Sequence, residues 1–341
     1  MLETIWFLLW GLIWGIYFML DGFDFGLGIL LPFITRSDKE KRLIYNAMGP
    51  FWDGNEVWLV IAGGVTFAAF PATYAVMFST LYTPLLMILF ALIIRAVSFE
   101  FRNKITSQSW KSFWDACLFI GSFTPALLFG VAFANIFKGI PFDKNYMFQG
   151  NLLTLLNPYG LLGGLLFLAL SLEHGAIWLA IKSDGNLQKK AKSVASGLWI
   201  FLLFVAVGFL GYTWFATSLY DNYLSNPFLF ILPFITVLAL LSTRVLIFKN
   251  AFWKAWAASC VTILTTILFG FVGLFPNMYP SSVDPVLNLT AFNASSTPLT
   301  LKIMLGVALV MVPIIIAYQT WAYYLFSGKI DEAMLSSKES Y

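Results

Sequence analysis

The sequence has 341 residues, of which 60% are hydrophobic and 11% are charged, and its formal net charge is +3. Soluble domains contain roughly 45–50% apolar and about 25% charged residues, so this composition excludes a water-soluble globular protein. The charged residues gather in short clusters between long apolar runs, which indicates that lipid surrounds most of the chain. The small positive excess does not point to nucleic acid as a partner.

A membrane-spanning helix needs about 20 mainly apolar residues, and nine runs of the sequence meet that requirement. They lie at about residues 5–33, 51–71, 74–95, 113–137, 157–181, 194–217, 228–248, 255–275 and 300–326. The first run follows Glu3 and has no Lys or Arg before it, so it is predicted to be a retained span and not a cleaved signal peptide. The polar segments between the runs are too short to fold alone, and residues 1–341 are predicted to form a single all-α transmembrane domain.

The basic residues divide unevenly between the two sides of the predicted bundle. One side holds only Lys138, Lys144 and Lys302, and the other side holds the remaining seventeen of the 20 Lys and Arg residues. These seventeen are Arg36, Lys39, Lys41, Arg42, Arg95, Arg102, Lys104, Lys111, Lys182, Lys189, Lys190, Lys192, Arg244, Lys249, Lys254, Lys329 and Lys338. By the positive-inside rule the basic side is cytoplasmic, so the N-terminus is predicted outside and the C-terminus inside.

The first span holds two acids within its apolar run. Asp21 and Asp24, in LDGFDFG, are three residues apart and so share one helix face. Asp24 lies about ten residues before the predicted inner boundary, which places it about 15 Å deep, near the middle of the membrane. A charged side chain at a helix centre costs about 2.5–3.5 kcal/mol on insertion scales, so each acid needs a compensating partner or a function.

The same span contains two patterns of small residues with three residues between them. Gly11 and Gly15 form the first pattern, and Gly22 and Gly26 form the second. Such spacing lets helix backbones approach closely, so close packing against a neighbouring helix is predicted here.

The second and third spans bring further charged residues toward the cytoplasmic surface. The candidates there are the acids Asp53, Glu56 and Glu100, the charge partner Arg95 and, as secondary candidates, Trp52 and Asn55. Because short loops join the first three spans, these helices are predicted to be neighbours, with Glu100, Asp53, Glu56 and Asp24 at increasing depth. Carboxylates in a low-dielectric medium can hold and release protons, so this series is consistent with a proton path from the cytoplasm. The alternative is structural: Arg95 neutralises one acid and the cluster holds three helices together.

The fifth span holds Glu173 and the single histidine, His174, about eight residues before its cytoplasmic end. His174 could ligate a haem or pass a proton, but one histidine cannot supply the ligands of several haems, and the sequence has no Cys-x-x-Cys-His motif. Both residues are secondary candidates, like Asp21, and their role stays open. Cys117 and Cys260 lie in apolar runs without metal-site spacing, so no metal is predicted.

Six ordered segments carry a recognisable pattern. They are DGFDFG (21–26), WDGNEVW (52–58), AGGVTFAAFP (62–71), GSFTPALLFGVAFAN (121–135), LNPYGLLGG (156–164) and FPNMYPSS (275–282). Together with SSTPLTL (295–301) before the last span, they resemble subunit II of the cytochrome bd-type quinol oxidases, and the likeness runs the length of the chain.

The resemblance implies nine transmembrane helices arranged as two four-helix bundles plus one peripheral helix. It also implies a haem-free subunit of the bacterial cytoplasmic membrane that supports subunit I, where two b-type haems, one d-type haem and the quinol site lie. That complex oxidises quinol and reduces dioxygen to water with protons from the cytoplasm. In the family, residues matching Asp24, Asp53, Glu100 and Arg95 are implicated in the proton route or the subunit contact. The family has an aspartate where this chain has Glu100, which keeps the carboxylate on a longer arm.

Other features of the family leave alternatives open for this chain. A lipid or a quinone can occupy a groove in this subunit, and a small single-helix subunit is a further candidate partner. Two rival interpretations are an assembly subunit without a proton role and a secondary transporter with its site at a repeat interface. A transporter would have broken helices at matching positions of its two halves, and Pro50, Pro84, Pro125 and Pro233 form no such pair.

Overall fold

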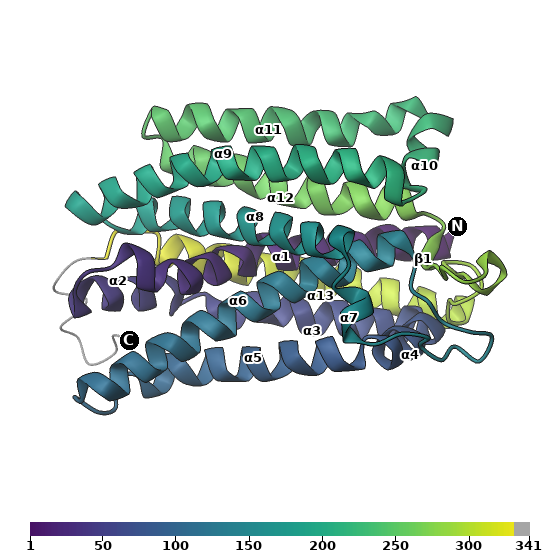
Figure 1. Ribbon diagram of the computed structural model, residues 1–341, viewed down its shortest axis with the longest axis horizontal. Helices are drawn as coiled ribbons and strands as arrows, with labels where there is room; N and C mark the ends of the chain where they lie inside the picture. Colours follow the sequence, from purple (N-terminus) through teal and green to yellow (C-terminus); the bar gives the residue numbers. More distant parts are fainter. Residues whose placement is uncertain (331–341) are drawn as a thin grey trace.

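The computed structural model describes residues 1–330, so Lys338, one of the seventeen basic residues, lies outside the described part. Within this range, eight helical segments are long and apolar enough to cross a membrane. They are α1 (Leu2–Ile34), α5 (Tyr82–Phe101), α6 (Gln108–Lys138), α8 (Pro158–Lys182), α9 (Gly185–Ala216), η1 (Pro227–Phe230) with α11 (Ile231–Phe248), α12 (Phe252–Leu274) and α13 (Pro298–Leu325). Figure 1 shows these helices running along one common axis.

Short elements close the two ends of the bundle. One end carries the amphipathic helix α2 (Asp38–Met48), the loop 102–107 and the turns at 183–184 and 249–251, and it is called the basic end below. The opposite end carries α4 (Pro71–Thr80), α7 (Leu152–Leu155), α10 (Leu219–Ser225), η2 (Pro285–Leu287) and the antiparallel strands β1 (Asn277–Tyr279) and β2 (Leu289–Thr290). In Figure 1 the basic end lies at the left and the strands lie at the right.

The second predicted span corresponds to α3 (Trp52–Ala69). Its 18 residues extend about 27 Å, close to the thickness of a hydrocarbon core, but Asp53, Asn55 and Glu56 reduce the apolarity of its first turns. Helix α3 ends before Phe70, and α4 begins at Pro71. Proline suits this first helical position because the backbone nitrogen there has no acceptor within the helix. Helix α3 packs along α1 and supplies Asn55 and Glu56 to the site described below.

The third span differs from the predicted range 74–95. The structure has α5 at Tyr82–Phe101, so the helix begins later and continues past Arg95. The expected boundary assumed that the arginine would mark the membrane surface. Arg95 is instead fully buried against carboxylates of other helices, so the helix does not need to end there. In the same way, α9 begins at Gly185, before the predicted start near residue 194, because its polar first turns pack at the basic end, where Leu187 and Ala191 are buried and Lys190 pairs with Glu40.

The long helices form two groups, and this arrangement confirms the predicted all-α membrane fold. In the first group α1 packs on α3 and α6, and α5 packs on α6; in the second, α8 packs on α9 and α12, and α11 packs on α12. The peripheral helix α13 touches α1 and α3, and only 6% of its apolar stretch is buried, against 89% in α8. The pair α1 and α8 therefore forms the centre on which the other helices pack.

The central pair depends on glycines that have no room for a side chain. A Cβ added at Gly26 would lie 1.9 Å from the carbonyl oxygen of Ser171, and one at Gly175 would lie 2.7 Å from the nitrogen of Leu27. Gly26 is the second glycine of the pattern Gly22 to Gly26, while a Cβ at Gly22 would meet only ordinary contacts. Close backbone approach at this crossing of α1 and α8 fixes how α1 is rotated, and so which of its residues face α3 and α5.

Candidate functional site

Arg95 is the centre of a buried charge cluster that joins three helices. Its guanidinium pairs with Asp21 of α1 through both Nη atoms, and the Nη1–Oδ2 distance is 3.3 Å. The Nη2 atom also lies 3.4 Å from Oε1 of Glu56 on α3. The ring of Phe25 lies 4.5 Å from Cζ on another side of the guanidinium. Since an unpaired buried charge is costly, these contacts together make α1, α3 and α5 mutually dependent.

Asp24 is fully buried one turn from Asp21 and has a different kind of environment. Its Oδ2 accepts a hydrogen bond of 2.8 Å from Nδ2 of Asn55, whose same nitrogen donates to the carbonyl oxygen of Leu20 at 3.1 Å. The second oxygen, Oδ1, has no hydrogen-bond partner among the described residues. One side of this carboxyl group is therefore anchored and the other is free.

The peripheral helix α13 reaches this site with two side chains. Tyr323 donates its hydroxyl hydrogen bond to Oδ1 of Asn55 over 3.0 Å. One turn earlier, Gln319 accepts from the indole of Trp58 at 2.7 Å and donates to the carbonyl oxygen of Gly54 at 2.8 Å. Neither α13 residue carries a charge at neutral pH, and both lie in the stretch YQTWAYY (318–324), so a search for charged residues within spans passes over them.

The two remaining acids of the predicted series lie at the basic end. Asp53 and Glu100 are both exposed, whereas the side chain of Glu56 is 22% exposed and Asp24 is fully buried. Trp52 stacks on Phe99 with ring centroids 5.0 Å apart, which joins the adjoining ends of α3 and α5. The structure thus brings Asp21, Asp24, Asn55, Glu56 and Arg95 together and leaves Asp53 and Glu100 nearer the surface.

Glu173 and His174 lie away from this cluster, between α8, α12 and α1. His174 contacts Ser259 Oγ through Nδ1 at 2.9 Å and the carbonyl oxygen of Met19 through Nε2 at 3.1 Å. The carbonyl can only accept, so Nε2 carries the hydrogen and Nδ1 accepts from Ser259. Glu173 has a long contact of 3.5 Å with Ser259, and its Oε1 has no partner among the described residues.

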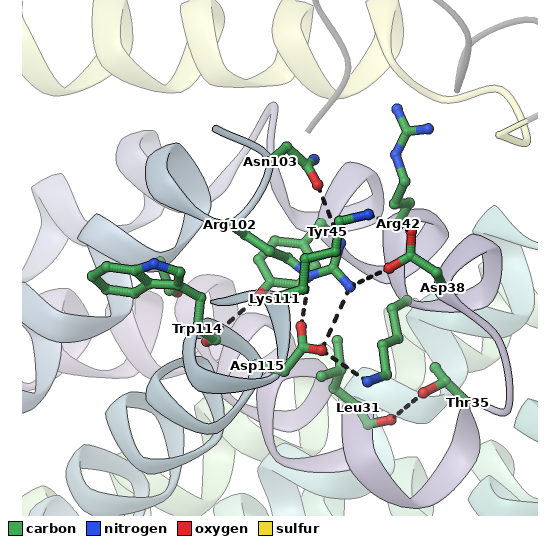
Figure 2. Close-up of polar contacts among 12 residues, drawn as sticks. Leu31, Thr35, Asp38, Arg42, Tyr45, Arg102, Asn103, Lys111, Trp114 and Asp115 are labelled. Atoms are coloured by element: carbon green, nitrogen blue, oxygen red, sulfur yellow. Dashed lines mark hydrogen bonds and ion pairs between the residues drawn. The ribbon is translucent and has the colours of Figure 1, made fainter. Parts of the chain in front are cut away.

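A second cluster of charges, which the sequence reasoning missed, lies at the basic end (Figure 2). Arg102, at the end of α5, pairs with Asp115 of α6 at 2.6 Å and with Asp38 of α2 at 2.8 Å. Lys111 pairs with Asp38 at 2.9 Å, and Lys41 pairs with Asp115 at 2.8 Å. Asp115 falls inside the predicted span 113–137, so the rule that flags acids within spans would have found it.

The pKa of Asp38 follows from these contacts. Partial burial raises the pKa, but the hydrogen bonds and positive charges of Lys111 and Arg102 outweigh that effect and lower it below its ordinary value. Asp38 is therefore ionised in the folded protein, and the cluster acts as a set of ion pairs between α2, α5 and α6. Among residues 1–330, no group of three or more His, Cys, Asp and Glu side chains is arranged to hold a metal ion.

Comparison with known proteins identifies the family. The profile described as cytochrome bd terminal oxidase subunit II matches residues 2–326. The chain belongs to the cytochrome bd oxidase subunit II family. It is 35% identical to cytochrome bd-I ubiquinol oxidase subunit 2 of Escherichia coli, with 97% of this chain and 96% of the relative covered. It is 32% identical to cytochrome bd ubiquinol oxidase subunit 2 of Bacillus subtilis, with 97% of each chain covered.

A solved structure supports the fold of this subunit II chain. A chain in the structure of bd oxidase from Geobacillus thermodenitrificans superposes with a TM-score of 0.76 over 95% of this chain and 98% of that chain, at 16% sequence identity. The relatives named above are subunits of a ubiquinol oxidase, an oxidoreductase complex of respiration. Membership of the subunit II family therefore replaces the transporter interpretation.

Proposed function

We propose that this chain is the haem-free subunit II of a quinol:oxygen oxidoreductase and that it supports a haem-bearing subunit I. The resemblance stated from the sequence assigns two b-type haems and one d-type haem to that partner, where they would supply electron transfer and dioxygen reduction. In this chain the single histidine does not suit haem ligation, because both ring nitrogens of His174 are already engaged by Ser259 and Met19. Its relatives function as subunit 2 of such complexes, which supports the proposal.

A role in proton uptake is the second part of the proposal. Asp53 and Glu100, exposed at the basic end, would collect protons, and Glu56 and Asp24 would pass them inward. The observation that carries this proposal is the state of Asp24: it is fully buried, and one of its two oxygens has no hydrogen-bond partner within residues 1–330. A buried acid without a cationic partner of its own is suited to binding and releasing a proton, whereas Asp21 is committed to Arg95.

The proposed location is the bacterial cytoplasmic membrane, with the basic end in the cytoplasm. This orientation follows from the uneven distribution of Lys and Arg and would place Asp53 and Glu100 on the side from which protons are taken. A small single-helix subunit is a further proposed partner, and this proposal rests on the family resemblance described from the sequence.

A groove beside the site is the candidate position for a membrane lipid or a quinone. It has a volume of about 550 Å³ and is lined by side chains of α1, α3, α12 and α13, including Trp58, Trp256 and Tyr323. A long apolar chain, from either type of molecule, suits this lining because most of the exposed surface in the groove is carbon.

The test of the proton route is Asp24→Asn in the intact complex with subunit I. The variant keeps an oxygen that can accept from Asn55 but cannot release a proton as a carboxyl group does, so quinol oxidase turnover should fall about tenfold or more. The haem absorbance spectrum should stay unchanged. Asp53→Asn should also lower turnover, and Glu100→Gln should lower it least, because water reaches that exposed position.

Two results would contradict the route. Loss of haem together with activity in Asp24→Asn would indicate an assembly role for this subunit. A larger effect of Glu100→Gln than of Asp24→Asn would overturn the proposed order by depth.

A further inference from the structure

The amide of Asn55 is fixed from three sides. Its Nδ2 donates to the carbonyl oxygen of Leu20 and to Oδ2 of Asp24, at 3.1 and 2.8 Å. Its Oδ1 accepts from the hydroxyl of Tyr323 at 3.0 Å. A flipped amide would turn its oxygen toward the carbonyl oxygen of Leu20 and its NH₂ group toward the phenol, so the observed orientation is the one that satisfies all partners.

This fixed amide makes the two oxygens of Asp24 unequal. Oδ2 is held by an N–H donor, so a proton on that oxygen would compete with the hydrogen bond from Asn55. Oδ1 has no partner among the described residues and is buried. When Asp24 gains a proton, the lone pair of Oδ1 is the one that can accept it without loss of an existing contact.

We propose that Asn55, held in place by Tyr323, is a positioning residue that fixes the Asp24 carboxyl so that Oδ1 takes up and releases the proton. The step forms an O–H bond at Oδ1 and breaks it again on release, and no electron is transferred. This inference rests on the proposed proton route. It extends that route to Tyr323, a residue of the last helix that lies 268 positions after Asn55 in the chain.

Other charged and titratable groups act on Asp24 from the neighbouring helices. Asp21 lies on the same helix, Glu56 faces it from α3 and Arg95 faces it from α5. On the side of Tyr323 the additional titratable group is Cys260 of α12. The charges of the acids and the arginine are held by their own ion pairs, so the contact that α13 controls directly is the hydrogen bond from Tyr323 to Asn55.

The location of Tyr323 explains how this contact can respond to its surroundings. Helix α13 is the least buried span, and Tyr323 lines the groove of about 550 Å³ between α1, α12 and α13. A small displacement of α13 would lengthen the contact between Tyr323 and Asn55, together with the hydrogen bonds of Gln319 to Trp58 and Gly54. Of the two α13 side chains that reach the site, Tyr323 is the one that bonds directly to the amide holding Asp24.

The test is Tyr323→Phe in the intact complex, with quinol oxidase turnover measured across pH. The variant keeps the ring and removes one hydrogen bond, so turnover should fall about three- to tenfold at neutral pH and the pH profile should shift. Asn55→Leu should produce a larger change in the same direction. Haem spectra of both variants should match the wild type.

Two controls separate positioning from packing. Tyr318→Phe removes a hydroxyl from an exposed tyrosine of α13 whose ring contacts Trp321, and should leave the pH profile unchanged. Gln319→Leu removes the two hydrogen bonds to Trp58 and Gly54 but keeps the hydroxyl of Tyr323 on Asn55, so it should not reproduce the pH shift of Tyr323→Phe. A wild-type profile for Tyr323→Phe, or the same shift in Gln319→Leu, would overturn the inference.

Asp24→Asn, measured beside them, separates this inference from the proposed function. Unchanged turnover in Asp24→Asn would overturn the proton route itself. Reduced turnover in Asp24→Asn with a wild-type profile in both Tyr323→Phe and Asn55→Leu would leave the route standing and remove only the positioning role.

Discussion

Two buried arginines, Arg95 within α5 and Arg102 directly after its last residue, have different sets of ion-pair partners. Arg95 lies within the bundle and pairs with Asp21 and Glu56, while Arg102 lies at the basic end and pairs with Asp115 and Asp38. Both side chains are fully buried, so removal of one partner leaves an uncompensated charge in either case. The cluster around Arg102 includes the half-exposed Asp38, and its contribution to stability can be measured as the unfolding temperature at different pH values.

Asp38→Asn should lower the unfolding temperature of the purified complex, and the effect should depend on pH. The folded pKa of Asp38 is below its unfolded value, so its stabilising contribution is complete above about pH 4 and is lost as the pH falls through the folded pKa. The difference in unfolding temperature between wild type and variant should therefore be constant near neutral pH and close on acidification below about pH 4. Thermal unfolding of both proteins in detergent, at constant ionic strength and a series of pH values, measures this difference. A difference that persists unchanged at the lowest pH would contradict the ion-pair assignment.

Among the elements, the packing of α1 against α8 determines where the polar residues point. Gly26 and Gly175 let the two backbones meet, and Asp21 and Asp24 then face α3 and α5 on the other side of α1. A change at this crossing would therefore disturb the site from a distance.

Gly26→Ala should destabilise the subunit, because the added Cβ would overlap the carbonyl group of Ser171. Overpacking of this kind costs typically about 1–3 kcal/mol, so we expect less assembled complex and a lower unfolding temperature. Gly208→Ala on α9 is the matched control, since a Cβ there meets nothing within 4 Å. Equal yields and unfolding temperatures for the two variants would show that the crossing tolerates the extra methyl group.

At the scale of the whole molecule, the basic end and the end that carries β1 should lie on opposite sides of the membrane. Val286 is 87% exposed in the segment between β1 and β2. A cysteine at this position should react with a membrane-impermeant thiol reagent in spheroplasts, whose cytoplasmic membrane is intact. A cysteine at Lys104, exposed in the loop of the basic end, should react only after the membrane is permeabilised. Cys117→Ser supplies the background chain, because the remaining Cys260 is buried. The reverse labelling pattern would invert the proposed orientation.

The sequence by itself determined the class of fold, the approximate spans and the family. These follow from local properties: long apolar runs, their length and ordered motifs, all of which are legible without knowing which helices touch. The tertiary structure alone decided that α5 continues past Arg95 and that Asp21, a secondary candidate, is the main partner of that arginine. It also decided that Asp24 depends on Asn55 and, through it, on Tyr323 of the last helix. Such contacts depend on how each helix is rotated about its axis, and that rotation is set by packing such as the Gly26 crossing, which apolarity and length do not specify.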